Sequence, residues 1–199
     1  GYLRDILIAI FLGAGPIADA FFVAFRIPNT FRRLFSEGTF NAAFIPSYSS
    51  ELNKSNKSAK LFANNIFNIL FLSLLAIVFV IEIFMPLFVK LIAPGFTENS
   101  EKLETAINLT RITFPFLLFV SLSSFFSAIL NSHNKFAAAS ATPIILNIIL
   151  ILVLLFGKFL ADKLIYYIAY AVTFAGLVQL IFLIFFVRKH FIPKISFNF

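Results

Sequence analysis

The sequence predicts an all-α membrane protein, and three of its properties support this class. Of its 199 residues, 60% are hydrophobic and only 13% are charged, whereas about a quarter of a soluble domain is charged. Apolar stretches of about 20 residues, the length that a helix needs to cross a bilayer, recur along the chain. No ten-residue alternation of apolar and polar residues indicates a β-barrel, and unpaired backbone is too costly in lipid, so helices are favoured.

Three membrane segments are expected in the first half of the chain. Residues 1–13 contain "YLRDILIAIFL", which is too short to span a bilayer, so the first helix is expected to be truncated. Residues 16–35 form the second segment, and Pro28 within it predicts a kinked or broken helix whose polar face turns inward. Residues 61–92 form a third segment that is long enough to tilt.

Three further segments follow, at residues 104–131, 137–157 and 164–187. Polar turns separate them, including "NSHNKF" and "GKFLADK", and a Pro-Gly turn with an acidic loop precedes the fourth segment. Residues 37–60 connect the second and third segments. Their first half fits a re-entrant or interfacial piece, and their second half is expected to be a solvated basic linker. The prediction is therefore a protein with six transmembrane helices.

The distribution of lysine and arginine predicts how the chain is oriented. When the loops are assigned alternately to the two membrane sides, one side receives nine basic residues and the other receives four. The positive-inside rule places the richer side in the cytoplasm, together with "NSHNKF" and the C-terminal tail, and the acidic loop outside. The net charge of +7 thus follows from membrane topology, and nucleic acid is not expected as a partner.

Several charged residues lie inside or beside the second segment, although each costs about 2.5–3.5 kcal/mol at the centre of a membrane helix. Asp19 and Arg26 are two turns apart and share one helix face. In one interpretation they form an internal ion pair, while Arg32 and Arg33 snorkel to the cytoplasmic interface. In the other, arginines face a water-filled cavity and bind an anion, because a planar guanidinium grips phosphate with two parallel hydrogen bonds.

The sequence contains no arrangement of residues that predicts catalysis. It has no cysteine, no phosphate-binding glycine loop and no nucleophile–base pattern, and His133 is a lone loop histidine that is expected to be solvated. We therefore expect no catalytic residues, no metal site and no cofactor. Intramembrane amides at Asn64, Asn68, Asn147 and Gln179 are expected to join helices by hydrogen bonds. A protein of this kind moves or binds a molecule and is not an enzyme.

Several sequence stretches resemble one family closely. They are "LRDILIAIFLGAG", "ADAFFVAFRIPNTFRRLFSEGTFNAAFIPSYS", "APGF", "RITFPFLLFVSLSSFFSAILNSHNKF" and "TPIILNI". In this order they resemble the bacterial MurJ/MviN family, which comprises lipid II flippases of the multidrug/oligosaccharidyl-lipid/polysaccharide exporter superfamily. The resemblance covers essentially the whole chain.

The resemblance implies a two-lobed transporter in the bacterial inner (cytoplasmic) membrane. Residues 1–199 would be its N-terminal six-helix transmembrane lobe, incomplete at the N-terminus, with the C-terminal lobe of the same polypeptide absent. The implied function is to move lipid II, the undecaprenyl-pyrophosphate-linked peptidoglycan precursor, from the inner to the outer leaflet by alternating access. The implied partners are lipid II, membrane lipid and the C-terminal lobe.

The resemblance also implies roles for five residues: Arg4 and Arg32 as substrate-binding residues, and Asp5, Asp19 and Glu37 as supporting polar residues. Helical phase alone favours other arginines, because Arg32 lies about 140° around the helix from Asp19 whereas Arg26 and Arg33 share its face. Pro28 can reset this phase. We therefore follow the family pattern for Arg32, and a share of Arg26 or Arg33 in the same role stays open.

Two other classes of function remain as alternatives. One is a different member of the superfamily, either a flippase for another lipid-linked oligosaccharide or a drug/cation antiporter. An antiporter is expected to use intramembrane carboxylates, and Asp19 beside Arg26 keeps this possibility open. The other is a membrane enzyme that acts on polyprenyl phosphates, which would need clustered carboxylates or histidines on a cytoplasmic loop. The loops of this sequence contain no such cluster.

Overall fold

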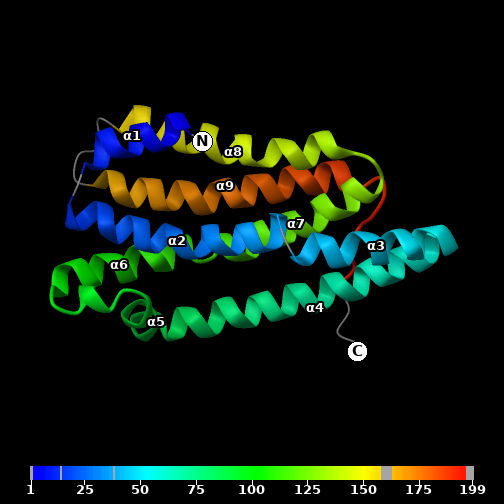
Figure 1. Ribbon diagram of the computed structural model, residues 1–199, viewed down its shortest axis with the longest axis horizontal. Helices are drawn as coiled ribbons and strands as arrows, with labels where there is room; N and C mark the ends of the chain where they lie inside the picture. The colour runs from blue at the N-terminus through cyan, green and yellow to red at the C-terminus, as the bar shows by residue number, and fades with distance from the viewer. Residues whose placement is uncertain (1, 14, 38, 158–162, 196–199) are drawn as a thin grey trace.

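The computed structural model describes residues 2–13, 15–37, 39–157 and 163–195, and the side chains of these residues except 27, 31–37 and 39. Within these ranges the chain is helical and has no strand. Its helices lie side by side in an elongated bundle (Figure 1). Their bounds are α1 Tyr2–Leu12, α2 Pro16–Glu37, α3 Thr39–Lys54, α4 Asn56–Ile83, α5 Met85–Ile92, a 3₁₀ turn η1 Pro94–Phe96, α6 Ser100–Thr113, α7 Phe116–Ser132, α8 Phe136–Phe156 and α9 Leu164–Val187.

Two of the expected segments are each divided into two helices. The third segment is interrupted at Phe84, between α4 and α5, and Pro86 is the second residue of α5. The fourth is interrupted between α6 and α7, where Pro115 precedes the first residue of α7. Proline lacks an N–H and its ring clashes with the carbonyl four residues earlier, so a membrane helix tends to end near it. The hydroxyl of Thr173 in α9 donates to the carbonyl of Ile112 beside the second interruption.

The second segment was expected to be kinked or broken at Pro28. It is not broken, because α2 runs without interruption from Pro16 to Glu37, and a kink stays a prediction. The missing N–H of Pro28 would have paired with the carbonyl of Ala24, four residues earlier. The buried hydroxyl of Thr113 in α6 donates to that carbonyl at 3.0 Å instead. A neighbouring helix thus satisfies the backbone group that the proline leaves free, which is how membrane helices tolerate proline.

The second half of residues 37–60, expected to be a solvated basic linker, is exposed at residues 53–57 but is largely helical, and the interfacial position expected for the first half stays a prediction. Most of residues 37–60 is helical: α3 ends at Lys54, and the side chain of Ser55 caps α4 by accepting from the Ser58 N–H at 3.0 Å. Phe44 and Tyr48, one turn apart on α3, are buried and stack on each other with ring centroids 5.5 Å apart. Figure 1 shows α3 continuing the direction of α2 and lying along the start of α4.

Four helical stretches in the described part of the chain are long and apolar enough to cross a membrane: α4, residues 100–132, α8 and α9. α1 and α2 are not among these stretches, because α1 has only 11 residues and α2 carries several charges. The protein is therefore a multi-pass, all-helical membrane protein, whereas the count of six spans is not confirmed. Many large apolar side chains of α4, α8 and α9 are exposed, as expected for surfaces in contact with lipid.

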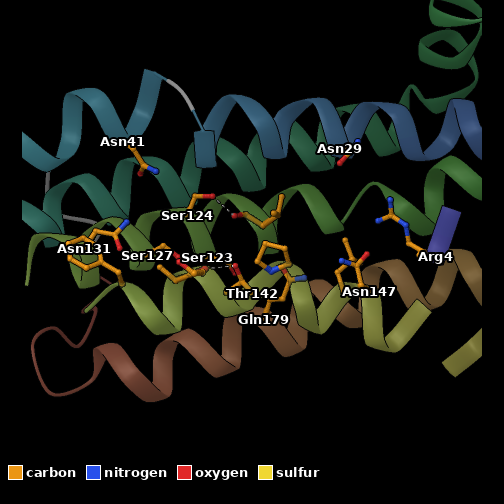
Figure 2. A pocket seen from close by; sticks show the side chains of 16 residues that line it. Arg4, Asn29, Asn41, Ser123, Ser124, Ser127, Asn131, Thr142, Asn147 and Gln179 are labelled. Carbon is orange, nitrogen blue, oxygen red and sulfur yellow. Dashed lines mark hydrogen bonds between the residues drawn. The ribbon is translucent and has the colours of Figure 1, made fainter. Parts of the chain in front are cut away.

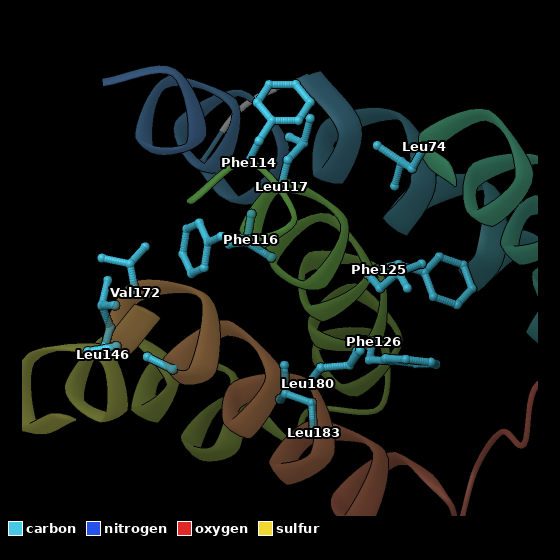
Figure 3. Packing of buried hydrophobic residues seen from close by; sticks show 14 of the residues in the cluster. Leu74, Phe114, Phe116, Leu117, Phe125, Phe126, Leu146, Val172, Leu180 and Leu183 are labelled. Carbon is cyan, nitrogen blue, oxygen red and sulfur yellow. The ribbon is translucent and has the colours of Figure 1, made fainter. Parts of the chain in front are cut away.

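The core of the bundle surrounds α7, which packs against α2, α3, α4, α8 and α9. Figure 3 shows Phe116 and Phe126 of α7 beside apolar side chains of α9. The Phe125 ring points the other way and contacts the rings of Phe44 on α3 and Phe67 on α4. α7 and α9 approach closely at Gly176, where an added Cβ would lie 2.5 Å from the Phe116 ring. Glycine at this position lets the two backbones come together, and small residues commonly do so between membrane helices.

The two ends of the bundle contain different connections (Figure 1). The α3–α4 junction, the α7–α8 turn and the end of α9 lie at one end, and the α1–α2 connection, the α5–α6 connection and the start of α9 lie at the other. This agrees with the alternate assignment of loops to two sides. The first end is therefore the one that the positive-inside rule places in the cytoplasm.

Candidate functional site

A polar cavity of about 470 Å³ lies mainly between α7 and α8 and opens to the surface, where its lining residues Phe136, Ser140 and Pro143 are exposed. α7 contributes Ser123, Ser124, Ser127 and Asn131, which are spaced so that they share one face of the helix. In a membrane helix such a polar stripe is expected to face a partner helix or water and not lipid. The cavity is thus a polar recess in a protein whose helices expose many apolar side chains.

The opposite side of the cavity is formed by α8, and other helices complete it. Lining residues from α8 include Ser140, Thr142 and Asn147, while α9 contributes Gln179. Single residues come from the first three helices: Arg4 from α1, Asn29 from α2 and Asn41 from α3. Figure 2 shows Arg4 near Asn147 at one end, Ser123 and Gln179 in the middle, and Asn41 and Asn131 at the other end.

Arg4 is the charged residue among the described side chains that line the cavity. Its side chain is only 17% exposed, and its Nε and Nη2 both donate to Oδ1 of Asp5, at 2.8 and 2.6 Å. The guanidinium carbon also lies 5.9 Å from the centroid of the Phe25 ring on α2, within the range of a cation–π contact. These contacts hold the cation in place at one end of the cavity.

Three polar atoms of the cavity wall are buried without a hydrogen-bond partner among the described residues. They are Oγ of Ser123, Oδ1 of Asn131 and Nε2 of Gln179. Ser124, the next residue on the same stripe, differs because its hydroxyl donates to the carbonyl of Val120 at 3.0 Å. The wall therefore contains hydrogen-bonding capacity that the described residues do not use.

Asp19 lies outside the residues that line the cavity. Its Oδ2 accepts from Nζ of Lys102 at 2.7 Å, and the same ammonium lies 4.3 Å from the Phe96 ring centroid. This ion pair joins the first turn of α2 to the first turn of α6. The internal pair with Arg26 that helical phase suggested is therefore replaced by a partner 83 positions away. The predicted support of an arginine by Asp19 stays a prediction.

The structure does not describe the side chains of Arg32, Arg33 and Glu37, although their backbone belongs to α2. The predicted pairing of Arg4 with Arg32 therefore lies outside the described residues and stays a prediction. Arg26 is exposed and does not line the cavity. Of the predicted residues, Arg4 lines the cavity, and Asp5 contacts the Arg4 side chain directly.

Sequence reasoning missed most of the cavity wall. The serines and asparagine of α7 have a spacing that would have indicated one polar face, but they lie in a stretch rich in phenylalanine. Asn147 and Gln179, expected to join helices, line the cavity. Asn64 has a different role from the one expected, since its Oδ1 accepts from the backbone N–H of Lys194 at 2.7 Å.

His133 is not the solvated loop histidine that was expected. It follows the last residue of α7, its Nε2 lies 3.2 Å from the Tyr48 hydroxyl, and its ring stacks on His190 with centroids 4.1 Å apart. Burial, and secondarily the charge of His190, lowers the pKa of His133. The described residues contain no group of three or more side chains that could hold a metal ion.

Apolar membrane-spanning helices beside a polar cavity, with an arginine held at one end of it, define a multi-pass membrane protein with a polar recess. The model of the family "Lipid II flippase MurJ" matches residues 8–199. The chain belongs to this family, which is one of flippases and not of enzymes, in agreement with the absence of a catalytic pattern in the sequence.

Individual relatives agree with this assignment. The chain is similar to the "Probable lipid II flippase MurJ" of Rhizobium tropici, with 43% identity over 185 residues, covering 90% of this chain and 35% of that protein. That of Rickettsia prowazekii (strain Madrid E) is 40% identical over 190 residues, covering 95% and 37%. The solved structure "Lipid II flippase MurJ, inward closed conformation" matches with a TM-score of 0.79 and 30% identity, covering 98% of this chain and 40% of that one. The chain spans little more than a third of the length of these curated relatives.

Proposed function

We propose that the chain is the N-terminal, six-span lobe of a two-lobed flippase in the bacterial inner membrane. The family match over residues 8–199 and the coverage of 35% to 40% of longer relatives support a lobe of this size. α1 and α2 would count as spans although neither meets a criterion of length and apolarity, because a charged helix that faces a cavity need not be apolar on every side. The second lobe would complete the cavity.

The function that the cavity supports best is the transfer of lipid II, an undecaprenyl-pyrophosphate-linked precursor, from the inner to the outer leaflet by alternating access. The single observation that carries this proposal is Arg4, a nearly buried cation in a polar cavity. A guanidinium has five N–H donors. Two of them, the one on Nε and one on Nη2, donate to Asp5. The others are available to a diphosphate, which charge-assisted hydrogen bonds would hold in place of water.

Arg32 would be the second ligand of the diphosphate, and Asp5, Asp19 and Glu37 would support the two arginines. Asp5 has a specific part in this scheme, because its carboxylate lies 2.6 Å from Arg4 and competes with an incoming anion. Such competition weakens binding, which suits a carrier because a carrier must also release its substrate. The prenyl tail would stay in lipid, since only the head group needs the polar cavity.

Arg4→Ala in the full-length protein is expected to slow lipid II translocation in reconstituted vesicles about 10- to 100-fold, because a charge-assisted hydrogen bond contributes about 1.5–3 kcal/mol. Arg4→Lys should recover only part of the rate, since an ammonium lacks the fork that grips two oxygens. Arg111→Ala serves as the matched control, because Arg111 is exposed and lies outside the cavity. Translocation at the wild-type rate by Arg4→Ala would refute the anion-binding role.

An antiporter centred on Asp19 has less support. Its side chain is 58% exposed, pairs with Lys102 and lies outside the cavity, so its contacts among the described residues do not resemble a proton relay along a transport path. A flippase for another lipid-linked oligosaccharide would use the same cavity and the same arginine. Competition between lipid II and such a lipid in the vesicle assay would distinguish the two substrates.

A further inference from the structure

Most of the cavity wall is polar but uncharged. We use the name amide–hydroxyl wall for Ser123 and Asn131 of α7 together with Gln179 of α9. Ser123 and Gln179 are 4% and 3% exposed, yet Oγ of the first and Nε2 of the second have no hydrogen-bond partner within the described residues. Oδ1 of Asn131 is also buried and has no hydrogen-bond partner within the described residues.

Buried polar atoms without partners are rare in native proteins, because each has lost its hydrogen bonds to water without replacement. A serine in a membrane helix can avoid this cost by donating to the carbonyl four residues earlier. Ser124 does so with Val120 at 3.0 Å, and Ser132 does so with Ala128 at 2.9 Å. Ser123, which lines the cavity from the same helix, does not use this alternative.

The chemistry of the wall differs from that of Arg4. A hydroxyl both donates and accepts, and a side-chain amide offers a donor on one atom and an acceptor on the other. Ionised phosphate oxygens only accept, so a wall with both donors and acceptors suits sugar hydroxyls and amide groups better. Figure 2 shows Arg4 at one end of the cavity, with Ser123 and Gln179 further along and Asn131 at the far end.

We infer that the amide–hydroxyl wall binds the uncharged hydroxyl and amide groups of a lipid-linked sugar while Arg4 binds its diphosphate. This inference rests on the proposed function and adds to it a residue set that distinguishes the glycosylated lipid from the bare prenyl diphosphate. The wall lies between Arg4 and the α7–α8 turn, so the sugar would extend from the diphosphate toward that turn.

The test compares two lipids on the purified full-length protein: lipid II, and undecaprenyl pyrophosphate, which has the same diphosphate but no sugar. Gln179→Leu keeps most of the side-chain volume and removes both hydrogen-bonding atoms. It is expected to raise the Kd for lipid II about tenfold and to leave the Kd for undecaprenyl pyrophosphate within about twofold. Ser123→Ala should raise the Kd for lipid II by a smaller factor and should also leave the Kd for undecaprenyl pyrophosphate unchanged within about twofold.

Two control variants separate binding from packing. Ser121→Ala removes a hydroxyl from the same helix, which is also buried and unpaired among the described residues but lies outside the cavity. Asn68→Leu removes a buried amide outside the cavity. Both should bind the two lipids like the wild type. Should Gln179→Leu fail to fold, Ser123→Ala measured against Ser121→Ala decides the question.

The outcomes separate this inference from the proposed function. An equal loss of affinity for both lipids, or no loss for lipid II, in Gln179→Leu and Ser123→Ala would overturn the role of the wall. Arg4→Ala should weaken the binding of both lipids. If it weakens neither, the proposed diphosphate site fails, while a loss specific to lipid II in the wall variants would still support sugar recognition.

Discussion

At Pro28 the ring removes the N–H that would pair with the carbonyl of Ala24, and the hydroxyl of Thr113 takes its place at 3.0 Å. Ala24 and Thr113 are both completely buried, so water does not compete for this bond. One side chain of α6 therefore keeps α2 continuous across a proline. The same contact holds α2, which contributes Asn29 to the cavity, against α6.

Thr113→Val should lower the free energy of unfolding by about 1–3 kcal/mol, because it leaves a buried carbonyl unpaired. Pro28→Ala restores the N–H, so in that background Thr113→Val should cost much less. Thermal unfolding in detergent measures the four members of this double-mutant cycle. The control is Thr110→Val, since the Thr110 hydroxyl bonds to the Ala106 carbonyl within its own helix. Strictly additive effects of Pro28→Ala and Thr113→Val would contradict the compensation.

Single residues of the site were predictable to different degrees. The resemblance selected Arg4, which lines the cavity, and Asp5, which forms an ion pair with Arg4. The partner of Asp19 was not predictable, because Lys102 lies 83 positions away and helical periodicity relates only residues on one helix. Gln179 was expected to join helices, because a lone polar residue in an apolar helix looks the same whether it joins helices or faces a cavity. Ser123 was missed because its polar stripe lies in a stretch rich in phenylalanine.

At the scale of elements, proline alone did not predict where helices end. α4 and α6 end close to Pro86 and Pro115, whereas Pro28, Pro46 and Pro143 lie inside helices. For Pro28 the difference is a hydroxyl on another helix, and no periodicity within a segment can reveal that. α3 was missed for a similar reason, since Phe44 and Tyr48 are buried by contacts with α4 and α7 that form only in the folded protein.

Gly176 allows the close approach of α7 and α9, and substitution there should separate them. A Cβ would lie 2.5 Å from Cδ2 of the Phe116 ring and 3.2 Å from Cβ of Phe119. Gly176→Ala should therefore lower the free energy of unfolding by about 1–3 kcal/mol, the usual cost of overpacking. The midpoint of thermal unfolding in detergent measures the effect.

Two further variants make this prediction specific. Gly95→Ala is the matched control, because an added Cβ meets no atom within 4 Å at Gly95. Phe116→Leu combined with Gly176→Ala should recover part of the lost stability, since the smaller side chain leaves room for the methyl group. The idea would be wrong if Gly176→Ala and Gly95→Ala were equally stable.

For the whole molecule, the all-helical membrane class and the order of the segments could be predicted, because composition and segment length decide both. The number of spans could not, since α1 and α2 combine apolar and charged residues and only their surroundings determine where they lie. The structure shows which connections lie at each end of the bundle, and they alternate between the two ends as the sequence predicted for the loops (Figure 1).

The orientation can be tested directly because the sequence contains no cysteine. Glu98→Cys and Lys135→Cys place single thiols at exposed positions, before α6 and in the α7–α8 turn. A thiol reagent that cannot cross membranes should label Glu98→Cys in spheroplasts and Lys135→Cys in inverted membrane vesicles. Labelling of both from the same side would contradict the arrangement of the bundle, and the reverse pattern would contradict its orientation.

The cavity described above would also shape the electric field in the membrane when water fills it. It reaches from Asn131 near the α7–α8 turn to Arg4, and water has a far higher dielectric constant than hydrocarbon. A transmembrane voltage is worth about 2.3 kcal/mol per elementary charge per 100 mV across the full membrane. Where a polar channel replaces part of the hydrocarbon, that voltage drops across the remaining thickness. An ion bound at Arg4 would then experience a steeper gradient than the same ion in an intact bilayer.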